Sequence, residues 1–309
     1  MTRILITGGA GMIGRALVEA LRGHDIVVTD LARAGLPDKV QFHRMDVTGS
    51  DPDTVIAELR PDVVVHLASI VTPPREMSRE DAFAVDVTGT RNVLEACKKH
   101  GVRRLVVTSS GAAYGYHADN PVPLTEDAPC RGNPEFPYAD HKRQVEEMLA
   151  AARQQHPELE QVILRIGTVL GAGTDNQITA LFRRKRLLAI KGSDSPFVFI
   201  WTRDLARILK RAATEGPAGI YNVAGDGWMS IDHLAEALGK PVLRLPAWAL
   251  KAALAVARPL GLSLYGPEQV RFLQYRPVLD NNRLKSVFGY SPELSSVEVF
   301  GLWRREAGL

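Results

Sequence analysis

A glycine-rich segment near the start of the chain restricts its fold more than any other feature. The run Thr7-Gly8-Gly9-Ala10-Gly11-Met12-Ile13-Gly14 follows an apolar stretch at Ile4–Ile6 and precedes residues 16–21, whose apolar positions have helical spacing. A second apolar stretch, Ile26–Val28, comes next. This order predicts a strand, a tight glycine turn, a helix and a second strand, with the N–H groups at the helix start open to a phosphate.

Asp30 ends the second predicted strand. A carboxylate there can accept hydrogen bonds from both ribose hydroxyls of an adenosine and would repel a 2′-phosphate, which predicts NAD rather than NADP. Arg33 softens that preference, because a guanidinium could pair with the extra phosphate. The alternative, ordinary turn glycines with Asp30 as a helix cap, leaves the full pattern unexplained. The residues predicted to hold the cofactor here are Gly8, Gly11, Met12, Ile13, Gly14 and Asp30.

The alternation of strands and helices continues along the chain. Strands are expected at 63–67, 104–108 and 161–165, with helices near 86–99 and 138–153. Strands that are apolar almost throughout and alternate with helices predict an α/β fold, a Rossmann-type doubly wound parallel sheet. We expect residues 1–165 to form the dinucleotide-binding domain, with the segment about 196–225 returning to it. Residues 166–309 are expected to form mainly a smaller α/β substrate-binding domain.

Composition excludes several classes of protein. The chain has 38 Lys and Arg residues against 35 Asp and Glu, a formal net charge of +3, which is too small to predict a nucleic-acid partner without a clustered basic face. Cys97 and Cys130 lack metal-ligand or redox spacing, so we expect no metal and a reducing compartment. With no secretory signal at the N-terminus, this indicates the cytoplasm.

The most apolar late segment, residues 246–264, is interrupted by Lys251, Arg258 and Pro259 and is too broken to span a membrane. It could form the wall of an apolar pocket, although a packed amphipathic helix or a dimer surface is the more ordinary interpretation.

Tyr138 and Lys142 are four residues apart on a predicted helix that Pro137 introduces, so both side chains should lie on one face. A phenol titrates near pH 10, and its use near neutrality requires positive charge, which Lys142 and an oxidised nicotinamide would supply. Tyr138 could then exchange a proton with a substrate oxygen while hydride moves to or from the nicotinamide. Alone, the pair would more often be a surface contact.

Support for this pair comes from the segment Thr108–Gly115, which directly follows the fourth predicted strand. Ligand-contacting residues of parallel sheets lie at the carboxyl ends of strands. A serine hydroxyl there can orient a reacting oxygen, although isolated serines after strands are often only caps.

At this point the sequence resembles the extended short-chain dehydrogenase/reductase family, which includes UDP-galactose epimerases, nucleotide-sugar dehydratases and hydroxysteroid dehydrogenase relatives. The resemblance covers most of the chain. Besides the glycine run and Tyr138-x-x-x-Lys142, it rests on Asp46-Val47, His66–Ser69, Asp86–Thr90, Leu164–Gly171, Asp204–Ala206 and Tyr221–Gly225.

The resemblance implies a role for several residues. Ser110 would be the catalytic hydroxyl beside Tyr138 and Lys142, with Ser109 as the neighbouring alternative. The residues expected to line the cofactor are Asp46, Val47, Leu67, Ala68, Ser69, Ser109, Tyr138, Lys142 and Ile166. Asp86 departs from the Asn that usually begins its motif. Relatives are commonly homodimers through two helices of the nucleotide-binding domain, and the resemblance suggests the same here.

The substrate is less defined than the chemistry. Nucleotide-sugar epimerases usually carry Asn where Thr168 stands and a diphosphate-binding Arg where Phe197 stands. The surroundings of Phe197 are aromatic and apolar in sequence, which argues against a UDP-sugar. Arg183–Arg186 and Arg276 remain alternative anion partners, although a charge run is more often a solvated face. The residues expected near the substrate are Ser110, Thr168, Phe197 and Trp201.

Three functions follow as hypotheses. The first is NAD-dependent oxidoreduction between a secondary alcohol and a ketone, on a small molecule without a nucleotide diphosphate. The second is epimerisation or dehydration of a sugar or nucleotide sugar, in which the same Tyr138 and Lys142 act and the cofactor is regenerated within each turnover. The third is a non-catalytic dinucleotide sensor, against which the intact Ser110, Tyr138 and Lys142 argue.

Overall fold

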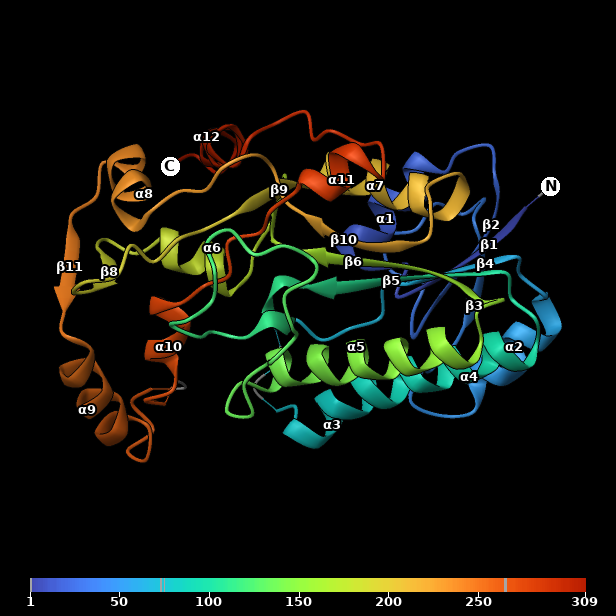
Figure 1. Ribbon diagram of the computed structural model, residues 1–309, viewed down its shortest axis with the longest axis horizontal. Coiled ribbons are helices and arrows are strands. Elements are labelled where there is room, and N and C mark those ends of the chain that lie inside the picture. Colours follow the sequence, from blue (N-terminus) through green and yellow to red (C-terminus); the bar gives the residue numbers. More distant parts are fainter. Residues whose placement is uncertain (1, 73, 75, 264–265) are drawn as a thin grey trace.

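Seven parallel strands form the central sheet of the protein (Figure 1). The computed structural model describes residues 2–72, 74, 76–263 and 266–309, so residue 264 of the apolar 246–264 segment lies outside the described residues. The strand order is β10-β6-β5-β4-β1-β2-β3. The chain therefore runs outward from β1 in one direction and returns to build the other half from β4, which places a topological switch point between β1 and β4.

The elements have the following bounds. The strands of the central sheet are β1 (Arg3–Thr7), β2 (Asp25–Asp30), β3 (Gln41–Arg44), β4 (Val63–His66), β5 (Arg104–Ser110), β6 (Glu160–Ile166) and β10 (Gly219–Val223). Two further parallel pairs are β7 (Thr168–Leu170) with β9 (Phe199–Trp201), and β8 (Leu187–Ile190) with β11 (Val242–Leu245). The helices are α1 (Met12–Ala20), α2 (Asp51–Leu59), α3 (Arg79–Phe83), the π-helix η1 (Ala84–Thr88), α4 (Gly89–Lys99), the 3₁₀ turn η2 (Gly111–Tyr114), α5 (Pro137–Gln155), α6 (Gln177–Phe182), α7 (Thr202–Thr214), α8 (Ile231–Leu238), α9 (Ala247–Ala257), α10 (Gln269–Gln274), α11 (Asn282–Ser286) and α12 (Ser296–Glu306).

Helices cover both faces of the central sheet. Figure 1 shows α1, α7 and α11 on one side, and α2, α4 and α5 on the other. Each side has its own core: Leu17 and Ile208 pack against Ile4 and Ile6 on the first, and Leu149 packs with the second. Alternate residues of a strand face opposite sides, so both sets must be apolar. The predicted doubly wound parallel sheet is confirmed.

Some elements differ from those that the apolar pattern indicated. β3 has the sequence Gln41-Phe42-His43-Arg44 and lies at the edge of the sheet, where it needs no continuous apolar run. Because β3 was not anticipated, Ser109 and Ser110 end the fifth strand instead of following the fourth. The helix expected from Asp86 begins at Gly89, because residues 84–88 form a π-helical turn before it.

The β8–β11 pair lies with helices α8 and α9 at one end of the molecule (Figure 1). Helix α9, within the apolar 246–264 segment, buries only Leu250, which packs with Ile190 and Val270, while Trp248 is 75% exposed. This helix therefore packs through one side, where Ala247 and Leu254 are also partly buried, and leaves Trp248 and Val256 exposed. No helix in the described part of the chain is long and apolar enough to cross a membrane.

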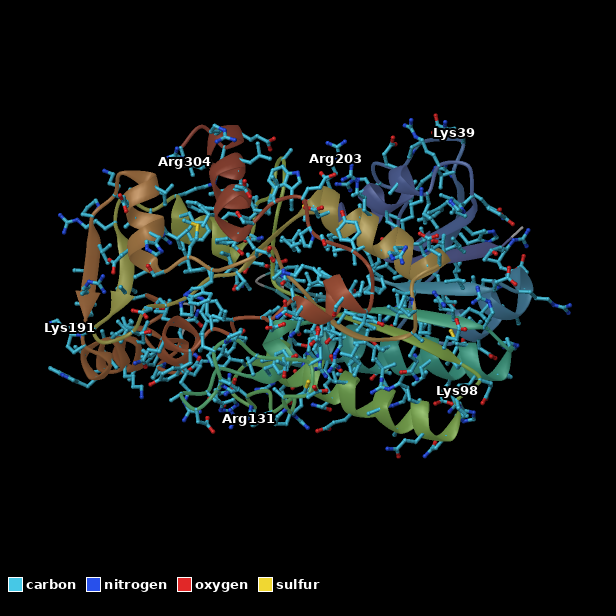
Figure 2. The ribbon with its side chains drawn as sticks, turned by 45° about the horizontal axis from the view of Figure 1, so that its top comes forward. Lys39, Lys98, Arg131, Lys191, Arg203 and Arg304 are labelled. Carbon is cyan, nitrogen blue, oxygen red and sulfur yellow. The ribbon has the colours of Figure 1, made fainter. Side chains whose placement is uncertain are left out.

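Basic side chains are spread over the surface. Figure 2 labels six that lie at separate places around the outline: Lys39, Lys98, Arg131, Lys191, Arg203 and Arg304. The run Arg183–Arg186 is exposed throughout. The absence of a nucleic-acid partner and the formation of a homodimer stay predictions.

A buried ion pair joins helix α5 to the sheet. Arg165 on β6 forms two hydrogen bonds with the Glu146 carboxylate, Nε to Oε1 at 2.9 Å and Nη2 to Oε2 at 3.0 Å. Its Nη1 donates to the Tyr114 hydroxyl and to the Glu126 carbonyl, each at 2.9 Å. A bidentate contact of this kind fixes orientation as well as distance. It therefore holds α5 in place against β6.

Glu146→Gln should lower the free energy of unfolding by about 3 kcal/mol, because it leaves the Arg165 guanidinium buried without its carboxylate. Glu147→Gln is the matched control, since Glu147 is exposed and pairs with Arg143 at the surface. Urea unfolding followed by circular dichroism measures both variants. Equal losses in the two would show that the buried pair contributes nothing beyond a surface contact.

Candidate active site

The glycine loop packs directly on the residues that follow β4. Gly8 has a φ of +66°, and a Cβ added to it would lie 2.6 Å from the backbone nitrogen of Ala68. A Cβ on Gly14 would lie 2.4 Å from the Cα of Gly9. Both contacts are far below van der Waals distance, so only glycine permits this approach of loop, helix and strand end.

The beginning of α1 has the properties that a pyrophosphate requires. Gly11 is the N-cap residue and has an extended backbone. Among the described atoms, a Cβ added to Gly11 would meet only the Gly8 carbonyl oxygen, at 3.3 Å, so the space beside it is open. The N–H groups of Met12 and Ile13 lie in the first turn, where a helix provides no partner. These residues fit the pyrophosphate of NAD, because backbone donors face a space that no side chain fills.

Asp30 lies beside this loop at the end of β2. Its Oδ2 accepts a hydrogen bond from the Ala10 N–H at 3.0 Å, which holds the carboxylate next to the glycines. Arg33 has turned to its own loop, where Nη2 donates to the carbonyls of Pro37 and Val40 at 2.9 and 3.0 Å. A 2′-phosphate would therefore meet the Asp30 carboxylate while the guanidinium is engaged elsewhere. This arrangement favours NAD.

The other predicted cofactor residues follow neighbouring strands. Asp46 and Val47 come after β3, and the Met45 N–H donates to the Asp30 carbonyl at 3.0 Å. Hydrogen bonds from the N–H and hydroxyl of Thr48 hold the pKa of Asp46 below its usual range. Leu67, Ala68 and Ser69 come after β4, next to Gly8. All lie at the carboxyl edge of the sheet, where parallel folds bind ligands.

Ser110, Tyr138 and Lys142 lie together at this edge. Lys142 on α5 donates from Nζ to the Thr108 carbonyl at 2.9 Å, and its ammonium lies 5.6 Å from the centre of the Tyr138 ring. The Tyr138 hydroxyl shares a hydrogen bond with Ser110. Pro137 begins the helix, so both side chains project from its first two turns. The geometry brings the three predicted catalytic residues into one group.

The two serines at the end of β5 face different surroundings. Successive residues of a strand point to opposite sides of the sheet. The Ser109 hydroxyl is buried and has no hydrogen-bond partner among the described residues, whereas Ser110 contacts Tyr138. Of the two alternatives, the arrangement favours Ser110 as the catalytic hydroxyl.

Burial controls the ionisation of the catalytic pair. It raises the pKa of the Tyr138 phenol well above its ordinary value, and the hydrogen bond with Ser110 opposes this shift. Burial also lowers the pKa of Lys142, which the negative charges of Asp86 and Glu146 oppose. Tyr138 is thus protonated in this state, and it becomes a base when positive charge in addition to that of Lys142 lies near it. The oxidised nicotinamide of NAD would supply such a charge.

Of the residues predicted near the substrate, Thr168 and Trp201 lie on the small β7–β9 pair, Phe197 precedes β9, and Ser110 ends β5. Thr168 pairs with Phe199 in this ladder, and its N–H donates to the Val198 carbonyl at 3.1 Å. Trp201 is partly buried at the end of β9. Phe197 is only 2% exposed, and its ring stacks 5.9 Å from that of Phe199. Phe197 therefore belongs to an aromatic core, while Thr168 and Ile166 lie at the carboxyl end of β6.

Arg276 lies beside the aromatic residues around Phe197. The sequence suggested it only as an alternative anion partner. Its guanidinium carbon is 3.8 Å from the ring centre of Phe197 and 4.6 Å from that of Phe272. The Phe272 ring in turn lies 5.2 Å from that of Tyr116, in the apolar cluster that includes Tyr138. The apolar surroundings expected for Phe197 are therefore wrong in one respect. A cation from a distant segment covers the ring.

His141 is a second residue that sequence reasoning missed. Its imidazole contacts the carboxylate of Asp86, which the sequence marked only as a departure from the usual Asn. The position of His141 between Tyr138 and Lys142 was visible, but the sequence did not show what lies across from it.

Comparison with known proteins agrees with this geometry. The model of the "NAD dependent epimerase/dehydratase family" matches residues 4–224. A UDP-glucose 4-epimerase of Mycolicibacterium smegmatis is 31% identical over 323 aligned residues, covering 96% of this chain and 95% of that protein. The NAD complex of a Thermus thermophilus UDP-glucose 4-epimerase is 28% identical with a TM-score of 0.73, covering 99% and 98%. A Thermotoga maritima UDP-glucose 4-epimerase with UDP-glucose, at 21% identity and a TM-score of 0.76, covers 99% of each chain and shows the fold alone.

Tyr138→Phe should slow hydride exchange between substrate and bound cofactor by about 10²- to 10⁴-fold, because it removes the group that exchanges the substrate proton. Cofactor content and thermal stability should stay close to those of the parent protein. Tyr221→Phe is the control, since the Tyr221 hydroxyl donates to the carbonyls of Pro217 and Ala218 on the edge strand β10, away from Tyr138. Stopped-flow absorbance of the reduced nicotinamide measures the rate, and an unchanged rate in Tyr138→Phe refutes the assigned role.

Proposed function

The chain belongs to the NAD-dependent epimerase/dehydratase family, and we propose that it is an epimerase that inverts a hydroxyl-bearing carbon of a nucleotide sugar. The cofactor is NAD, and it would remain bound while the substrate is oxidised and reduced again within each turnover. The family and relatives such as the Mycolicibacterium protein support this enzyme class. The choice of a nucleotide sugar as the substrate rests on the structure described here.

The surroundings of Arg276 are the main support for a nucleotide sugar as the substrate. Among the described residues, its guanidinium forms no ion pair with a carboxylate, and its buried Nε has no hydrogen-bond partner. Its nearest polar contact is a long one, from Nη1 to the Ser195 carbonyl at 3.5 Å. Burial lowers the pKa of Arg276 to about 9, so the group is still charged at neutral pH. A partly buried cation that has no carboxylate partner gains free energy when an anion arrives, and a diphosphate is such an anion.

This arrangement changes the interpretation of Phe197. In sequence, the loss of an arginine at this position argued against a nucleotide diphosphate. In the fold, the aromatic rings of Phe197 and Phe272 hold the guanidinium of Arg276 between them. Stacking on aromatic faces leaves the in-plane N–H donors of an arginine free for an anion. Net oxidoreduction of an uncharged alcohol consequently has less support than epimerisation.

The catalytic group can perform both halves of such a reaction. When bound, NAD supplies the acceptor for a hydride from the substrate carbon and the donor that returns it. Tyr138 takes the proton of the substrate hydroxyl during oxidation and gives it back during reduction, so no proton is gained or lost overall. The Ser110 hydroxyl orients the reacting oxygen. Lys142, held by the Thr108 carbonyl, lowers the energy of the Tyr138 phenolate through its charge.

The purified protein should release NAD on denaturation in an amount comparable to the protein itself, and it should interconvert UDP-glucose and UDP-galactose without added cofactor. The reason is that a redox-neutral cycle regenerates its own cofactor. Mass spectrometry of the denatured protein and proton NMR of the sugar measure the two properties. Free exchange of added NAD with net reduction by an alcohol would overturn the proposal. Formation of a dehydrated keto sugar would replace epimerisation by dehydration within the same family.

Arg276→Gln should raise KM for a nucleotide sugar about 10- to 100-fold and change kcat much less, because it removes charge-assisted hydrogen bonds that form in the ground state as well. Arg276→Lys keeps the charge and should recover part of the loss. Arg271→Gln is the control on the same segment, since Arg271 is exposed and pairs with Glu135. Steady-state kinetics of the variants test this, and an unchanged KM in Arg276→Gln contradicts an anionic substrate at this position.

A further inference from the structure

Asp86 is a buried carboxylate in the π-helical turn between α3 and α4. It accepts three hydrogen bonds: the Ser69 hydroxyl and the Ile70 N–H each donate to Oδ1 at 2.8 Å, and His141 Nδ1 donates to Oδ2 at 2.9 Å. Both side chains of the Asp86–His141 pair are almost completely buried. Short π-helical turns occur frequently at functional sites, because they displace one side chain from the regular helical position.

The three donors come from two elements of the candidate site. Ser69 and Ile70 follow β4 in the segment that packs on Gly8, where the cofactor is expected. His141 lies on α5, one residue before Lys142. A single carboxylate therefore ties the cofactor-lining segment to the catalytic helix. The ring of Phe83 closes the other side of His141, edge to face at 5.5 Å.

The groups whose charges could act on Lys142 come from three elements, and the carboxylates among them are those of Glu146 and Asp86. Glu146 is bound by both arms of Arg165. His66 on β4 contributes no charge near neutral pH, because burial lowers its pKa to about 3. The remaining charge is that of Asp86, which interacts with Lys142 and also with Tyr138.

Asp86 itself remains ionised. Burial raises its pKa, but the hydrogen bond from His141, the charge of Lys142 and the donors at 69–70 outweigh this and leave the pKa below its usual value. An Asn at this position could keep both contacts at Oδ1, but it would carry no charge and would present an N–H₂ group to His141.

We propose that Asp86 and His141 form a positioning pair that supplies the counter-charge of Lys142 and fixes the segment at residues 68–70 against the catalytic helix. The pair makes no contact with the reacting atoms. It acts through Lys142 and Tyr138, because the charge of Asp86 acts on both groups. A negative charge near both groups favours the protonated form of each.

Asp86→Asn removes the negative charge of Asp86 while the side chain keeps nearly the same shape. Both apparent pKa values of the Tyr138–Lys142 pair should move to lower pH by about 0.5 to 1 unit, because a negative charge that favoured protonation is lost. One readout is the pH profile of kcat, and it can be measured only if the proposed function is correct. The other is the tyrosinate absorbance of the NAD-loaded protein minus that of Tyr138→Phe, which needs no substrate. A shift in absorbance without epimerase activity would thus support this pair while the proposed function fails.

Two further variants keep the test decisive. Asp53→Asn is the matched control: Asp53 forms the same kind of Asp–His contact with His100, at 2.7 Å on the surface of α2, and its loss should leave both pKa values unchanged. His141→Gln retains an amide donor for Oδ2 and the Asp86 charge, so the pKa values should stay or rise. Unchanged pKa values in Asp86→Asn, or a fall in His141→Gln, would overturn the proposal even if stability changes. If Asp86→Asn does not fold, His141→Gln alone gives the answer.

Discussion

The hydrogen bond from the Lys142 ammonium to the Thr108 carbonyl sets the geometry on which the rest of the site depends. It crosses from helix α5 to the carboxyl end of β5 at 2.9 Å. Ser110 lies two residues further along β5, on the same side as Thr108, and Tyr138 lies one turn before Lys142. Once this contact fixes the distance and rotation of the helix, the phenol and the serine hydroxyl meet. The Arg165–Glu146 pair holds the next turns of the same helix, so the alignment does not rely on one contact.

The cofactor edge of the site was largely predictable from sequence. Gly8, Gly14 and Asp30 are close together along the chain, and their positions follow from the order of one strand, one turn and one helix. Tyr138 and Lys142 were predictable for the same reason, since four residues make one helical turn. In each case local geometry determines which groups meet.

The substrate edge was not predictable, because its contacts join segments that are far apart in sequence. In the sequence, Phe197 stands where related epimerases carry a diphosphate-binding Arg, so a positive charge seemed to be missing. Only the folded chain shows that Arg276 lies on the Phe197 ring. Asp86 and His141 likewise meet across 55 residues, through a π-helical turn that an apolar pattern does not indicate. β3 was missed for a different reason, since an edge strand can be half polar.

Charge balance distinguishes the two halves of the site. Lys142 is buried, but the Asp86 carboxylate offsets its charge within the protein, while Glu146 is paired with Arg165, so these charges are balanced before any substrate arrives. Arg276 is partly buried against two aromatic rings and forms no ion pair with a carboxylate of the described residues. Leaving a partly buried cation without a counter-charge costs free energy, and folding alone does not require it. An anionic substrate removes that cost on binding, so the binding energy for the remote part of the substrate would be available to align its reacting carbon with Tyr138.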